Sequence, residues 1–124
     1  MTPSQCFLSV LLLVVLSCIT CVDVDVNDEE VQKIATFAGM EINGGTNDMH
    51  IMMVTKIVKA KREVVAGINF HLTLEMTLTD CVKGGKQVSC KLRDTTHLCD
   101  VTVWDQPWTN TRRLTDCSCV PDIA

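Results

Sequence analysis

Residues 68–79 read INFHLTLEMTLT, and apolar and polar side chains alternate along the whole segment. The apolar series consists of Ile68, Phe70, Leu72, Leu74, Met76 and Leu78. Because successive side chains of a β-strand point to opposite faces, this alternation predicts a strand with one buried face. The segment decides the fold, since other strands must flank it and another layer must cover its apolar side.

Three further strands are predicted around this segment. Residues 49–65 are rich in β-branched and apolar side chains, and shorter candidates follow at 98–104 and 113–120. The strand at 49–65 is predicted to carry a basic outer face formed by Lys56, Lys59, Lys61 and Arg62. A solvated sheet face explains these charges better than binding of a polyanion does.

Turn residues place the connections between the strands. Gly67 predicts a turn at 65–67, and Pro107 predicts another at 105–110. Residues 83–94, which contain two adjacent glycines, are predicted to form a loop. Successive connections of an antiparallel meander lie at alternating ends of the sheet, so the first and third turns are expected side by side.

One helix is predicted before the strands. Asn27 and Glu30 have the spacing of a capping box, so the helix is expected to begin at Asn27. One apolar stripe at helical spacing consists of Val31, Ile34, Ala35, Ala38 and Ile42. Gly44 and Gly45 are expected to end the helix in the left-handed conformation. Ahead of it, residues 22–26 alternate Val and Asp and are expected to edge the sheet.

These elements predict an α+β fold in which a single helix packs across a twisted antiparallel sheet of four to five strands. The chain has 124 residues, enough for one small domain. Residues 1–21 are predicted to be a secretory signal peptide, because nine of the ten residues from Phe7 to Leu16 are apolar and small residues follow. The mature, secreted domain is then 22–124. The apolar run is too short for a membrane span, so no membrane association is expected.

Composition argues against several functions. The chain has 11 basic and 15 acidic side chains, a net charge of −4, and its longest basic runs are pairs. Nucleic-acid binding, which needs a concentrated basic surface, is not expected. No Ser, His and Asp set suggests a catalytic centre, so neither an enzyme nor a cofactor is expected.

The eight cysteines are expected to form disulfides rather than a metal site, because secreted thiols are oxidised. If cleavage follows Cys21, five remain, and six remain if it follows Thr20. The pair Cys18 and Cys21 is lost or split by that cleavage, and His50, His71 and His97 are scattered along the chain. A zinc site is therefore not expected.

Two predicted turns carry exposed apolar residues. Val64 and Val65 lie in the first, and Pro107 and Trp108 lie in the second. A tryptophan in a turn is typical of a binding surface, and the alternative is that Trp108 folds back onto the sheet as core. Trp104, within a strand, is the better candidate for a structural tryptophan.

The order of these features resembles the secreted, two-disulfide cystatins, inhibitors of papain-like cysteine peptidases such as cathepsins. The resemblance is carried by the leader, the helix, the segment 63–67, the cysteines and the Pro-Trp pair. It implies a peptidase-binding edge made of Glu63, Val64, Val65, Ala66, Gly67, Pro107 and Trp108. The two hairpins would enter the peptidase cleft as a reversible, competitive wedge.

The resemblance also implies two disulfides, Cys81 with Cys90 and Cys99 with Cys119. Cys117 is left unassigned. Because Cys117 lies two residues before Cys119, the alternative is that Cys99 bonds to Cys117 instead of Cys119. Cys21 is another candidate partner for Cys117 if it survives cleavage.

Two departures from the family pattern touch function. Glu63 stands where the family has Gln, which places a carboxylate at the edge, where an unpaired charge is costly to desolvate. The family's glycine before the helix has no counterpart, since the first glycine, Gly39, falls inside the predicted helix. Weaker or more selective inhibition is expected. The alternative function is a secreted binding protein that kept this fold without inhibiting.

Thr46, Asn47 and Asp48 are similar to the family's Ser-Asn-Asp segment, which blocks legumain-type peptidases in some members. An ordinary Asn/Asp turn is the alternative. A monomer is expected, with a dimer formed by exchange of hairpins as the other oligomeric option.

Overall fold

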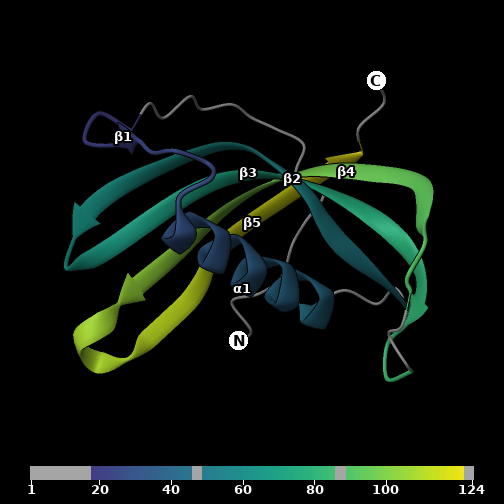
Figure 1. Cartoon of the computed structure of the whole chain (residues 1–124). Helices are drawn as coiled ribbons and strands as arrows, with labels where there is room; N and C mark the ends of the chain where they lie inside the picture. Colours follow the sequence, from purple (N-terminus) through teal and green to yellow (C-terminus); the bar gives the residue numbers. More distant parts are fainter. Residues whose placement is uncertain (1–17, 46–48, 86–88, 122–124) are drawn as a thin grey trace.

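The computed structural model describes residues 18–45, 49–85 and 89–121. Figure 1 shows the helix lying across one face of a twisted sheet. The elements are β1 (Val22–Asp23), α1 (Glu29–Gly45), β2 (His50–Val65), β3 (Gly67–Val82), β4 (Leu92–Gln106), the 3-10 turn η1 (Pro107–Thr109) and β5 (Thr111–Pro121). All neighbouring strands are antiparallel, in the order β1-β2-β3-β4-β5. The predicted α+β meander is confirmed.

The core lies between α1 and the sheet. The predicted helical stripe is buried, and Ile34 and Ala38 have no exposed surface. Opposite them lie the core-facing residues of the sheet, which include Phe70, Leu72, Leu74, Met76, Val101 and Val103. Complete burial of an isoleucine of this kind contributes about 1.5 to 3 kcal/mol. The predicted alternation is therefore confirmed from Phe70 to Met76. It is wrong at Leu78, which is half-buried while Thr77 and Thr79 are buried, at the place where the pairing with β4 shifts register.

The predicted ends of the helix are wrong by a residue or two. Asp28, not Asn27, caps the first turn, because its Oδ1 accepts the backbone N–H of Glu30 at 2.8 Å. At the other end α1 continues through Gly44 and Gly45. The carboxyl end is anchored by Asn43, whose carboxamide hydrogen bonds both the N–H and the C=O of Met52 at 2.9 Å. One side chain thus pairs with β2 as a peptide group would.

Strands β4 and β5 are longer than predicted. β4 begins at Leu92, inside the predicted loop, because Leu92 and Thr96 pair with Thr79 and Thr77 of β3. Residues 92–95 are all exposed, so buried and exposed side chains do not alternate here. The sequence pattern therefore does not indicate this part of the strand. At its other end β4 includes Asp105 and Gln106, so the turn itself is limited to 107–110.

The basic face of β2 is only partly as predicted. Lys59 and Lys61 pair with Thr73 and His71, which lie on the face away from α1. Arg62 pairs with core-facing Phe70 and so lies on the other face of the sheet. The reason is the two-residue period of a strand, which separates adjacent residues onto opposite faces.

Disulfides join Cys81 to Cys90 and Cys99 to Cys119, the two pairs that the resemblance implied. Cys99 and Cys119 are directly paired in register, which settles the choice of partner on β5. Cys21 bonds to Cys18 rather than to Cys117. Cys117 is itself disulfide-bonded, so no described cysteine is a free thiol.

Within the described ranges, no helix has the length and apolarity needed to cross a membrane. Most of the predicted signal peptide lies outside these ranges, so its removal remains a prediction.

Candidate functional site

The turns at the ends of the β2–β3 and β4–β5 hairpins lie at the same end of the sheet, as Figure 1 shows on its left side. They are joined by hydrogen bonds. The carbonyl oxygen of Ala66, at the tip of the first hairpin, accepts the indole N–H of Trp104 at 3.0 Å. The same oxygen accepts a second hydrogen bond, from Nε2 of Gln106 at 3.3 Å. Trp104 was expected in the core, but it is half-buried on the face away from α1, where it pairs with Asn69. Its structural role is to hold one hairpin against the other.

Gly67 is needed because the two hairpins approach so closely. Its φ of +110° lies in the left-handed range, which disfavours residues with a side chain. A Cβ added there would lie 2.8 Å from the carbonyl oxygen of Asp105 and 3.0 Å from Nε1 of Trp104. Both the backbone conformation and the available space thus require glycine at this position.

The two tips present apolar surface to solvent. Val64 is 73% exposed, Val65 41% and Trp108 70%, and Ala66 and Pro107 are also exposed. The alternative in which Trp108 folds back as core is wrong. Val22 on β1 adds an exposed apolar side chain from a third segment close by, because it pairs with Arg62 near the end of β2. Exposed apolar side chains gathered in this way are typical of a protein-binding surface.

The second hairpin is shaped locally by its turn residues. Pro107 begins the 3-10 turn, and Asn110 ends it in the left-handed conformation with φ of 54°. The N–H of Asn110 donates to the carbonyl oxygen of Pro107 at 3.0 Å. The hydroxyl of Thr109 lies 2.8 Å from Oε1 of Gln106, which ties the turn to the end of β4. This closed turn leaves the Trp108 side chain pointing away from the fold.

An ion pair fixes the base of the second hairpin. Nε of Arg112 donates to Oδ1 of Asp105 at 2.9 Å, and the Asp105 side chain is only 6% exposed. The guanidinium of Arg112 also lies 5.9 Å from the centre of the Phe37 ring on α1. A cation over an aromatic face is attracted to it. Arg112 therefore links the hairpin to the helix, a contact that sequence reasoning missed.

Comparison with known proteins identifies the family. The family model described as the cystatin domain matches residues 19–108. The chain belongs to the cystatin family. Rat cystatin-C (Rattus norvegicus) is 35% identical over 103 residues, which cover 78% of this chain and 74% of the relative. Chicken cystatin (Gallus gallus) is 35% identical over 104 residues, 79% and 75% of the two chains.

Solved structures agree with this assignment. The crystal structure of Al-CPI superposes with a TM-score of 0.76 at 32% identity, covering 82% of this chain and 98% of that one. Dimeric human cystatin F superposes with a TM-score of 0.73 at 23% identity, which supports the fold alone. Cystatins are cysteine peptidase inhibitors, so the family is one of inhibitors rather than enzymes.

Glu63 of this cystatin does not carry the unpaired charge that sequence reasoning assumed. Its Oε1 lies 3.1 Å from Nε2 of His71 and 3.4 Å from Nδ2 of Asn69. Its Oε2 accepts the hydroxyl of Thr20 at 3.0 Å. These hydrogen bonds, led by that of His71, hold the pKa of the Glu63 carboxyl below its ordinary value. The carboxylate is bound on the sheet rather than left free at the edge.

Among the residues that the structure describes, one group of potential metal ligands gathers around that carboxylate. Cys18, Cys21, Glu63 and His71 bring ligand atoms within 4.8 Å of one another. Sequence reasoning missed His71 here because 50 residues separate it from Cys21 along the chain. The two sulfurs are bonded to each other, which leaves no thiolate to bind zinc.

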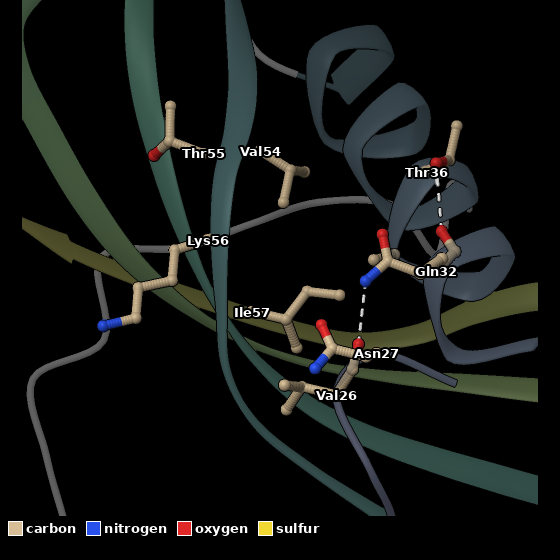
Figure 2. Close-up of a pocket in the computed structure, with 9 residues that line it drawn as sticks. Val26, Asn27, Gln32, Thr36, Val54, Thr55, Lys56 and Ile57 are labelled. Carbon is tan, nitrogen blue, oxygen red and sulfur yellow. Dashed lines mark hydrogen bonds between the residues drawn. The ribbon is translucent and has the colours of Figure 1, made fainter. Parts of the chain in front are cut away.

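A hollow of about 440 Å³ lies between α1 and the middle of β2, well back along β2 from the hairpin tips (Figure 2). Its polar side chains are partly engaged, since Gln32 donates to the carbonyl oxygen of Val26 at 2.8 Å and Thr36 donates to that of Gln32. Lys56 is its one charged side chain. The hollow thus brings together no acid and base pair for chemistry.

Thr46, Asn47 and Asp48 lie outside the described residues. The second, legumain-type site implied by the resemblance therefore remains a prediction.

Proposed function

We propose that the chain is a secreted, reversible and competitive inhibitor of papain-like cysteine peptidases of the cathepsin type. The leader at 1–21 would be removed, and the domain at 22–124 would act outside the cell. Its two hairpins would fill the active-site cleft, with Val65 and Trp108 as apolar anchors. Glu63, Val64, Ala66, Gly67 and Pro107 complete the proposed contact edge.

The observation that carries this proposal is the joining of two exposed apolar tips into one surface. Val65 and Trp108 come from hairpins far apart in the sequence, yet the bonds from Trp104 and Gln106 to Ala66 tie those hairpins together. A preformed surface loses little conformational entropy on binding, which favours tight association. The wedge would cover the catalytic thiolate without offering it a correctly placed peptide bond, so it would act by exclusion.

The test is a titration of the oxidised protein, secreted from cells expressing the full chain, against papain and a cathepsin L-like enzyme. Inhibition should be competitive with a fluorogenic peptide substrate. Truncating a central tryptophan anchor typically costs roughly 2 to 4 kcal/mol, so Trp108→Ala should bind roughly 30-fold or more weakly. Because Trp108 is largely exposed, the variant should unfold at the wild-type temperature.

Leu92→Ala is the matched control, because Leu92 is 57% exposed but lies at the opposite end of β4 from the hairpin tip. Its inhibition constant should equal that of the wild type. An unchanged constant in Trp108→Ala would contradict the wedge. Folded, oxidised wild-type protein that inhibits neither enzyme would indicate a binding domain that kept the fold and lost this target.

A further inference from the structure

His71 reaches the first hairpin from a strand position outside the family motif. It lies on β3 between core-facing Phe70 and Leu72, so its ring stands on the face of the sheet away from α1. Glu63 on β2 pairs with Asn69, two residues before His71, and shares that face. The 3.1 Å contact between Nε2 of His71 and Oε1 of Glu63 is thus a diagonal cross-strand pair.

The imidazole is itself held in place from the next strand. Nδ1 of His71 lies 3.2 Å from the hydroxyl of Thr102 on β4. Since an ionised carboxylate only accepts hydrogen bonds, Nε2 must carry the hydrogen toward Glu63. In the neutral ring Nδ1 is then left to accept from Thr102. The chain Glu63, His71 and Thr102 crosses three strands beneath the two hairpins.

Glu63 would matter to binding because of where it stands. It is two residues from Val65 on one strand, so the two side chains share a face, with Cα atoms about 7 Å apart. A carboxylate that swung toward the tip would have to lose its water when a peptidase covered Val65. An uncompensated charge buried in an interface opposes binding. Something must therefore keep this carboxylate bound to its own sheet.

We propose that His71 is a positioning residue for inhibition, which holds the Glu63 carboxylate back along the sheet, away from Val65 at the hairpin tip. The inference rests on the proposed function and explains how a chain with Glu at this position could retain it. The strength of inhibition would then depend on a residue outside the proposed contact edge. Asn69 supports the same carboxylate through a longer bond of 3.4 Å.

The pair does not depend on the predicted leader. Thr20 also binds Glu63, but it lies at the expected cleavage site, whereas His71 and Asn69 belong to the mature domain. Other charged groups line the hollow that His71 shares on this face, namely Lys59, Lys61, Asp100 and Asp116. Two of these side chains are positively charged and two are negatively charged. The group to test is therefore His71, which hydrogen bonds Glu63 directly, rather than the combined charge of this face.

The experiment is a double-mutant cycle on the oxidised, secreted protein, with inhibition constants measured against papain. In the Glu63 background, His71→Ala should weaken inhibition by about tenfold, the size expected when a charged group loses its hydrogen-bond partner at an interface. In the Glu63→Gln background the same change should cost less than about twofold, because a neutral amide is far cheaper to desolvate. His71→Gln, which keeps an N–H donor, should recover most of the loss.

Thr73→Ala is the matched control, since Thr73 is the next outward residue of β3 and hydrogen bonds Asp100 rather than Glu63. It should act equally in both backgrounds. The pKa of Glu63, measured by NMR, should rise in His71→Ala, which checks that the pair exists in solution independently of inhibition.

The outcomes separate the two proposals. If wild-type protein inhibits and His71→Ala weakens it equally in both backgrounds, the positioning role is overturned and the wedge stands. If His71→Ala is folded and inhibits as the wild type does, the positioning role is overturned as well. If folded wild-type protein does not inhibit at all, the proposed function fails and the inference fails with it, whatever the titration of Glu63 shows.

Discussion

The indole nitrogen of Trp104 lies 3.0 Å from the carbonyl oxygen of Ala66, so the tip of the first hairpin is bonded to a side chain of β4. The two residues are 38 positions apart in the sequence. Trp104 is half-buried and Ala66 is exposed, so the bond lies at the margin between the core and the proposed binding edge. It ties the tip that carries Val65 to the strand that leads into Trp108, and the proposed two-hairpin wedge needs both tips in one surface.

Replacing Trp104 by Phe should weaken inhibition by roughly three- to tenfold. The variant keeps most of the ring but loses a neutral hydrogen bond, which is worth about 0.5 to 1.5 kcal/mol. Gln106 still donates to the same oxygen, so the hairpins should remain associated. The inhibition constant against papain measures the effect. A Trp104→Phe protein that inhibits as strongly as the wild type would show that this bond does not set the edge.

Gly67→Ala should destabilise the fold by about 2 kcal/mol or more and weaken inhibition. The new Cβ meets both a left-handed backbone and the carbonyl oxygen of Asp105 at 2.8 Å. Gly84→Ala is the control, because Gly84 has φ of +80° but its added Cβ meets no atom within 4 Å. It should cost only about 1 kcal/mol of backbone strain. Equal unfolding free energies for the two variants would contradict the close approach of the hairpins.

Arg112→Ala should lower the free energy of unfolding by about 2 kcal/mol. It leaves the carboxylate of Asp105, only 6% exposed, without its ion-pair partner and removes the cation over Phe37. Arg113→Ala is the neighbouring control, since Arg113 is exposed and should change stability by less than about 0.5 kcal/mol. Chemical denaturation of both variants makes the comparison. Similar losses of unfolding free energy in the two variants would contradict the stabilising role of the ion pair between Arg112 and Asp105.

Acid should destabilise the wild type more than it destabilises Glu63→Gln. The pKa of Glu63 is lowered in the folded protein, chiefly by the hydrogen bond from His71. Such a group stabilises the fold above its ordinary pKa, and this stability is lost as pH falls through the lowered value. The amide of the Glu63→Gln variant has no proton to gain in that range. Unfolding free energies of both proteins from pH 7 to pH 3 provide the test, and parallel curves would contradict the Glu63 and His71 pair.

Much of the fold follows from local patterns in the sequence. The helical stripe from Val31 to Ile42 is confirmed as a buried face, and so is the alternation along 68–79 as far as Met76, whereas Thr79 is buried beyond it in place of Leu78. Residues 92–95 are all exposed, so apolar and polar side chains need not alternate there. The sequence prediction therefore missed the start of β4. The helix cap was displaced by one residue, because Asn27 and Asp28 are both good capping residues and only geometry distinguishes them.

The candidate site was predicted as a set of turn residues but not as a bonded unit. Val64, Val65 and Trp108 stand out in the sequence because apolar side chains in turns are unusual, and the structure shows them exposed at one end of the sheet. The same reasoning treated Glu63 as an unpaired charge. Its partner, His71, looked in the sequence like one more outward residue of an alternating strand.

The sequence by itself determined the helix, the strand faces and the two turns, because the periods of burial and the conformational preferences of Gly, Pro and Asn act over a few neighbouring residues. The tertiary structure alone decided that Trp104 and Gln106 bind Ala66, that Arg112 joins Asp105 to Phe37, and that His71 binds Glu63. Those contacts depend on strand register and on the packing of the helix. A shift of register by one residue would keep every local pattern and send each of these side chains to the opposite face.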